Sequence, residues 1–259
     1  MIIEVLIWGF IVGVCVGFTA IGTGILGGPG LIVLFGMDPV IAVGTISLAA
    51  IPMRATSVLR HARAGNIDWN SAALFSLTAL PAAYFTARHA LAIHSIIELK
   101  YIIAAAIFIS IPLLIYRYRK LDKEKNGQLE QPEQPVESEA DRKTPQYILP
   151  VAGGILGAVI GVTGITGILT IIAFLLIFRL ESEVAVGTTS LVGFLALLIA
   201  GFAHFQAQNY NLTVFISLLP GVILGSYLGS ALVTKVPRNV LRYTILAIII
   251  LSGVIIMVR

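Results

Sequence analysis

Charged residues are concentrated in one short segment of this chain, and their distribution limits what the chain can fold into. Residues 117–143 carry 14 of the 30 charged side chains, seven of each sign. The remaining sequence contains repeated apolar runs that approach the ~20 residues needed to cross a bilayer. Soluble domains carry about a quarter charged residues, whereas this chain carries 12%. The pattern predicts an all-α polytopic membrane protein whose surroundings are the lipid bilayer.

Length and charge exclude two further classes of function. A chain of 259 residues holds roughly eight to ten membrane segments, which leaves no room for a separate soluble catalytic domain. The formal net charge is +4, a modest excess that is typical of cytoplasmic loops of membrane proteins. We therefore expect no nucleic-acid partner.

The chain divides into two membrane repeats joined by a polar linker. Residues 1–118 form the first predicted repeat, 119–145 a solvated charged linker with few apolar groups, and 146–259 the second repeat. The linker is predicted to be a tether, with a regulatory segment as the alternative. The apolar stretches number five per half and run over 3–21, 25–36, 39–60, 70–87, 96–116, 146–163, 165–178, 183–204, 212–232 and 239–258.

The two halves carry the same motif in the same order. The sequence Ala-Val-Gly-Thr occurs at 42–45 and again at 185–188. His61 and Asn66 recur as His204 and Asn209, 143 positions later. Polar residues that keep register over this distance indicate a duplicated module.

The distribution of basic residues favours inverted rather than parallel repeats. Segments 25–36 and 165–178 are too short to span a bilayer comfortably, so each is predicted to form a broken hairpin with the segment before it. Each repeat then contains an odd number of crossings. The inverted arrangement places thirteen of sixteen loop cations on the linker side, against ten in the parallel arrangement. By the positive-inside rule, the linker is then cytoplasmic and both termini lie outside.

Glycine and threonine residues interrupt each repeat at membrane depth. A helix that begins after such a break directs free N–H groups and a positive dipole end into the membrane interior, which suits an anion. Close helix packing by small residues is the alternative, and we prefer it for Gly9, Gly13, Gly153 and Gly157. The residues expected to line the breaks are Thr23, Gly24, Gly27, Gly28, Thr163, Gly164 and Thr166.

A polar stripe on the third segment supplies the second group of candidates. Ser47, Arg54 and His61 are spaced by seven and share one helix face. Arg54 has no charged counterpart in the second repeat, where Leu197 occupies its position. A guanidinium suits planar or tetrahedral oxyanions, and the alternative is that Arg54 extends to the cytoplasmic surface. The third segments are also expected to contribute the hydroxyls of Thr45, Ser47, Thr188, Thr189 and Ser190.

Two histidines stand near the ends of their segments. For His61 and His204, a gating or proton-coupling role and simple placement at the membrane interface both remain open. An intramembrane enzyme is disfavoured, because Ser47 and His61 on one helix are separated by ~21 Å. No His-Glu or Asp-rich metal motif occurs, and no cofactor is predicted.

Taken together, these residues resemble the TauE/SafE family of sulfite exporters and sulfonate permeases. The resemblance rests on Gly27-Gly-Pro-Gly30, on the duplicated Ala-x-Gly-Thr element, and on the run His61-x-x-x-Gly-Asn-Ile-Asp-Trp69. It covers nearly the whole chain outside the linker and implies secondary transport of small sulfur-containing anions across the cell membrane. A membrane scaffold or assembly factor is the alternative. The direction of transport, the coupling ion, the particular anion and the existence of a homo-oligomer stay open.

Overall fold

A computed structural model describes most of the chain. It covers residues 2–257 except 20–22, 126–147, 179 and 181, and except most of 233–257, where only 243, 246, 247, 250, 253, 254, 256 and 257 are described. The described residues contain helices and no strand. The prediction of an all-α membrane protein is therefore confirmed.

The described helices follow the predicted order of segments in both halves, apart from the additional short helix α5. The first half contains α1 (Ile2–Thr19), α2 (Gly24–Phe35), α3 (Pro39–Arg63), α4 (Trp69–Arg88), α5 (Ala90–Ile96) and α6 (Leu99–Lys125). The second half contains α7 (Ile148–Thr163), α8 (Ile168–Ile172), the π-helical turn η2 (Ala173–Ile177), α9 (Ser182–Gln206) and α10 (Leu212–Leu232). The tenth predicted segment, 239–258, lies largely outside the described residues.

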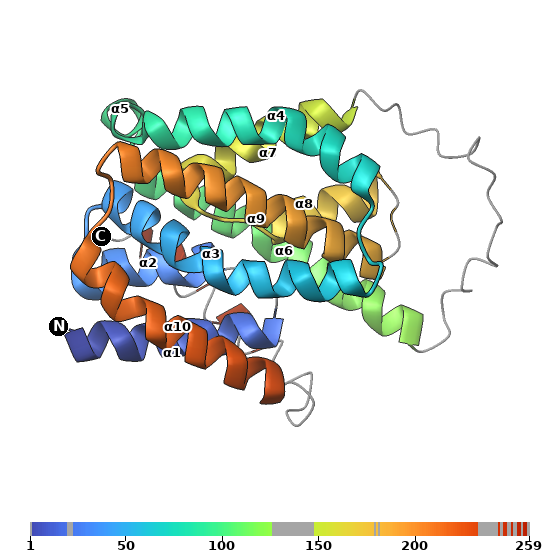
Figure 1. The fold of residues 1–259 in the computed structure, drawn as a ribbon, viewed down its shortest axis with the longest axis horizontal. Coiled ribbons are helices and arrows are strands. Elements are labelled where there is room, and N and C mark those ends of the chain that lie inside the picture. Colours follow the sequence, from blue (N-terminus) through green and yellow to red (C-terminus); the bar gives the residue numbers. More distant parts are fainter. Residues whose placement is uncertain are drawn as a thin grey trace.

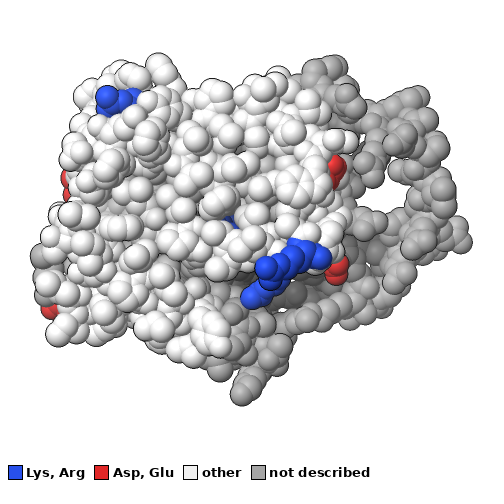
Figure 2. Space-filling view, viewed as in Figure 1, with Lys and Arg blue, Asp and Glu red and all other residues white. Residues whose placement is uncertain are grey.

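The long helices are suited to a membrane. Among the described residues, α3, α9 and α10 are long and apolar enough to cross a bilayer, and α5 with α6 adds a fourth candidate that is bent by 92°. Shorter apolar helices include α1, α2 and α7. Charged side chains lie mainly at the two ends of the molecule in Figure 2, and the band between them is nearly free of charge. This arrangement is the one that a hydrocarbon layer requires.

Carboxylates set where α3 and α4 begin. The side chain of Asp38 accepts a hydrogen bond from the backbone N–H of Val40 at 2.8 Å, and Asp68 accepts one from Asn70 at 3.2 Å. These caps satisfy N–H groups that have no partner within the helix. Both charged caps stand at helix ends, where water can reach them.

Glycines allow two pairs of helices to pack backbone against backbone. In the pairs α1·α10 and α4·α7, an added Cβ on any of the facing glycines would overlap a carbonyl oxygen of the partner helix. The predicted packing role of these glycines is thus confirmed. The contacts are Gly9 with Leu218, Gly13 with Val222, Gly153 with Phe75, and Gly157 with Ala79.

The pairing exchanges helices between the repeats. The first helix of the first half, α1, packs against α10, and the first helix of the second half, α7, packs against α4. The helices α3 and α9 pack against each other in the middle of the bundle (Figure 1). Each central helix also meets the loop after the other one: Gly44 of α3 contacts the carbonyl of Asn209, and Gly187 of α9 contacts the carbonyl of Asn66. The most extensive helix contacts among the described residues therefore join one repeat to the other.

Equivalent helices run in opposite directions. Residues later in α1 contact residues later in α10, and the same holds for α4 and α7, so the two helices of each pair run parallel. By contrast, the beginning of α3 meets the end of α9, so these central helices are antiparallel (Figure 1). The chain reverses between α3 and α4 and between α9 and α10 (Figure 1), so α1 runs opposite to its counterpart α7.

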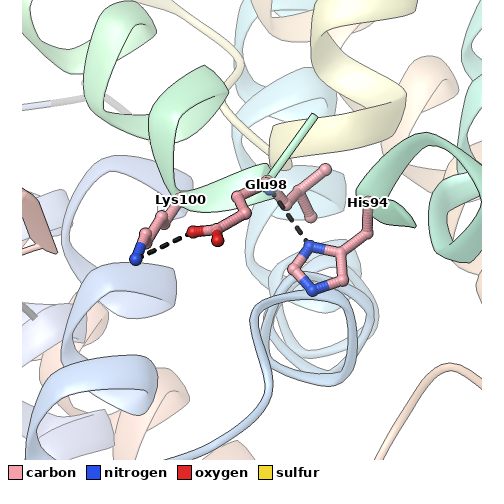
Figure 3. A network of polar contacts seen from close by, with 4 residues as sticks. His94, Glu98 and Lys100 are labelled. Carbon is pink, nitrogen blue, oxygen red and sulfur yellow. Dashed lines mark hydrogen bonds and ion pairs between the residues drawn. The ribbon is translucent and has the colours of Figure 1, made fainter. Parts of the chain in front are cut away.

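Two features of the α5–α6 region differ from the predicted segments. A short helix, α5, precedes α6, and Figure 3 shows the polar contacts at the bend between them. His94 Nδ1 accepts a hydrogen bond from the Leu99 N–H at 3.1 Å, and Lys100 pairs with Glu98 at 2.8 Å. In addition, α6 continues to Lys125, so the beginning of the predicted linker is helical, in accord with its Lys, Glu and Arg residues.

Candidate functional site

The two broken segments meet inside the bundle. Gly24, the first residue of α2, packs against the backbone of Gly164 and Ile165 in the second break, and a Cβ on Gly24 would lie 2.8 Å from the Ile165 Cα. Gly164 and Gly167 have φ angles of 66° and 103°. These left-handed values explain the need for glycine at this point. The structure thus brings together the breaks that the sequence separates by about half its length.

Arg54 projects from α3 to the second break. Its side chain is 6% exposed, and Nη2 donates a hydrogen bond to the hydroxyl of Thr166. Nη1 lies beside Gly193 of α9, where an added Cβ would stand 3.3 Å from it. The guanidinium therefore points into the bundle, toward the second repeat, and does not extend along α3 to the surface.

Polar groups without partners lie in the same region. Among the described residues, Arg54 Nε, Ser47 Oγ and Thr189 Oγ1 are buried and have no hydrogen-bond partner. Ser47 Oγ stands near Gly164, and Thr189 lies one turn before Gly193 on α9. Buried donors are normally satisfied, so a group of free ones indicates a place where a ligand or water can bind.

Two predicted hydroxyls hold loops of the opposite repeat. Thr45 Oγ1 donates to the carbonyl of Ile41 at 2.7 Å and accepts from the N–H of Asn211 at 3.0 Å. Thr188 Oγ1 accepts from the N–H of Asp68, also at 3.0 Å. Thr45 therefore connects α3 to the loop after α9, and Thr188 connects α9 to the loop after α3.

Two further predicted hydroxyls are also occupied. Thr163 Oγ1 donates to the carbonyl of Val159 at 2.7 Å and accepts from the N–H of Ile165 at 3.1 Å, which closes the end of α7. Ser190 Oγ accepts from the hydroxyl of Ser57 at 3.3 Å. In this structure these side chains stabilise helix ends and contacts between repeats.

The residues of the first break are positioned by packing. Gly27 and Gly28 face Ile46 of α3, and a Cβ on Gly27 would lie 2.5 Å from the Ile46 Cδ1. Thr23 is buried, and its carbonyl accepts from the Gly27 N–H at 2.7 Å. The first break thus lies against the Ser47 end of α3, while the guanidinium of Arg54 contacts the second break.

The two histidines have different surroundings. His61 is partly exposed at the end of α3, whereas His204 is fully buried. His204 Nε2 lies 3.1 Å from the carbonyl oxygen of Gly161, to which it donates a hydrogen bond. That carbonyl lies in the last turn of α7, where helix termination leaves backbone acceptors without a partner. His204 therefore caps the end of α7 and is not exposed on the surface of the bundle.

Sequence reasoning missed Gly193, although it contacts the guanidinium of Arg54. A signal was present, because the repeat offset of 143 aligns Gly193 with Ala50 in the first half, just as it aligns Arg54 with Leu197. Gly193 and Arg54 thus both differ from their counterparts in the other repeat. A comparison of the repeats at every position, and not only at the shared ones, would have identified it.

The buried His204 cap yields a prediction about stability. His204→Leu leaves the Gly161 carbonyl without its donor, so unfolding in detergent should become easier by about 1–3 kcal/mol. His204→Gln retains an N–H donor and should recover part of the loss. His61→Leu, at the equivalent but partly exposed position, should change stability by less than about 0.5 kcal/mol. Equal effects of the two leucine substitutions in a denaturant titration would contradict the capping role.

Comparisons with known proteins identify the family of this chain. Residues 5–256 match the family described as Sulfite exporter TauE/SafE. The chain is 27% identical over 266 residues to the probable membrane transporter protein YjnA of Bacillus subtilis (strain 168), and the match covers 98% of each chain. No solved structure matches the chain. From the extent of the family match, we conclude that this membrane-embedded chain belongs to the sulfite exporter TauE/SafE family and is a membrane transporter.

Proposed function

We propose that this protein is a secondary transporter of small sulfur-containing anions, such as sulfite or organosulfonates, across the cell membrane. The observation that supports this most directly is the buried guanidinium of Arg54, whose Nε has no partner among the described residues. It lies next to the second break, where the free hydroxyl of Ser47 stands near Gly164, and the free hydroxyl of Thr189 is one helical turn before Gly193. The family description supports the choice of sulfur anions.

The chemistry of these groups suits an oxyanion. A guanidinium presents N–H donors in a fixed plane that matches two oxygens of one anion, and a hydroxyl can donate to a third. A charged arginine at membrane depth is costly unless it has a partner. Thr166 provides only a neutral acceptor, so an anion would supply the missing counter-charge.

Alternating access follows from the way the helices pair. The pairs α1·α10 and α4·α7 are held by backbone contacts at glycine and would move as units, whereas the breaks contact α3 and α9 through side chains. We propose that one group of helices moves against the other around the anion, as in other transporters built from repeats. Such movement would expose Arg54 to each side of the membrane in turn.

We further propose that the repeats are inverted across the membrane, with the linker cytoplasmic and both termini outside. The opposite directions of equivalent helices support this arrangement. The excess of loop cations on the linker side supports it independently.

A non-transporting scaffold and an intramembrane enzyme are the alternative functions. A scaffold would use the breaks only for packing and would not need a free Arg54 Nε. An enzyme would need a base bonded to its nucleophile, but the hydroxyl of Ser47 has no hydrogen-bond partner among the described residues. The observed site therefore favours transport.

The binding role of Arg54 is tested by substitution. If the guanidinium pairs with the anion in a partly dehydrated site, Arg54→Ala should cost about 2–4 kcal/mol of binding, which is a loss of ~30- to 1000-fold in affinity. Arg54→Lys keeps the charge but loses the planar pair of N–H donors, so it should recover only part of the lost affinity. Dissociation constants for sulfite and methanesulfonate, measured on purified protein, provide the check. An Arg54→Ala protein that binds within about threefold of the parent would remove Arg54 from the site.

The inverted orientation is tested by labelling at equivalent loops. In a Cys15→Ala background, Ala207→Cys should react with an impermeant maleimide added outside intact cells, because the loop after α9 is then external. Ala64→Cys, the equivalent position after α3, should react only after the membrane is permeabilised. Reaction of both cysteines from the same side would support parallel repeats instead.

A further inference from the structure

The buried interior that the structure describes contains a single charged side chain. Among the described residues, Arg54 is the only Lys, Arg, Asp or Glu that is buried. The other buried polar side chains are hydroxyls, His204 and Asn209. His204 donates through Nε2 to the Gly161 carbonyl and needs no second proton to do so. The described site therefore offers one positive charge and several neutral donors.

This charge count limits the valence of the ligand. A singly charged oxyanion would neutralise the guanidinium and could accept a hydrogen bond from Arg54 Nε, which has no partner among the described residues. A doubly charged anion would leave one negative charge without a partner in a water-poor interior. An unpaired buried charge is strongly unfavourable, and the neutral hydroxyls can compensate only part of it.

The two repeats also differ where the guanidinium lies. Gly193 leaves room for Arg54 Nη1, whereas its counterpart Ala50 belongs to an apolar cluster with Leu197, the counterpart of Arg54. Ile160 and Ala196 complete that cluster. The bundle is duplicated in its packing, but space for a cationic side chain is built on one side only.

From these observations we propose that the site selects singly charged oxyanions and binds one per chain, at Arg54 and on the side opened by Gly193. The inference rests on the proposed transport of sulfur anions and restricts its substrates by charge. For sulfite, it assigns hydrogensulfite as the bound form. Sulfonates with no second acidic group fit the same rule.

Two pairs of probes separate charge from shape. Methanesulfonate and sulfate differ by one methyl group in place of one oxygen and by one unit of charge. Isethionate and sulfoacetate share a sulfonate on a two-carbon chain, but only sulfoacetate carries a second charge at neutral pH. Calorimetric titration of purified protein at constant ionic strength should show at least ~10-fold tighter binding of the singly charged member of each pair.

A substitution at Gly193 tests where the anion binds. A Cβ there would stand 3.3 Å from Arg54 Nη1 and 3.4 Å from the Thr166 Cβ, so Gly193→Ala should displace the guanidinium and weaken methanesulfonate binding by at least ~5-fold. Gly201→Ala on the same helix is the matched control. Its Cβ would lie 3.2 Å from the apolar side chains of Ile51 and Leu48, so affinity should stay within about twofold.

The outcomes distinguish this inference from the proposed function. If sulfate and sulfoacetate bind as tightly as their singly charged partners, selection by charge is wrong, although an oxyanion transporter remains. Equal affinities of the Gly193→Ala and Gly201→Ala proteins would overturn the location. If none of the four anions binds the parent protein, the proposed anion site itself fails, and the inference fails with it.

Discussion

A guanidinium enclosed in an apolar bundle is the constraint on which the arrangement of the site depends. Arg54 is almost fully buried, and its hydrogen bond to Thr166 joins the third helix of the first repeat to the break of the second. A charge at this depth needs a counter-charge or a set of donors and acceptors around it. The neutral groups nearby supply only part of this, and the proposed anion would supply the rest.

Duplication explains how the chain brings this site together. The first helix of each repeat has its most extensive contacts with the other repeat, because α1 packs on α10 and α7 packs on α4. Glycines at these contacts allow backbones to approach closely, which is how helices associate where no hydrophobic force acts between them. With the outer pairs formed by exchange, α3 and α9 are left to pack in the centre against both breaks. The candidate site thus requires both halves.

Some of this architecture could be predicted from the sequence. Apolar runs, glycine-rich breaks and the repeat are local patterns, and an arginine inside an apolar run stands out because of its cost. Pairings between distant helices could not be predicted. Thr45 has its partner Asn211 in the other repeat, and His204 is buried because α9 packs near the end of α7. These roles depend on which helices meet, and periodicity along one helix does not determine that.

Direct observation of an anion beside Arg54 would test the central claim most directly. Selenite is a chemical analogue of sulfite whose selenium gives an anomalous signal in X-ray diffraction. In crystals soaked with selenite, the account predicts one anomalous peak per chain within hydrogen-bonding distance of the Arg54 guanidinium and near the hydroxyls of Ser47 and Thr189. Selenium bound only elsewhere, with no peak at Arg54, would contradict it.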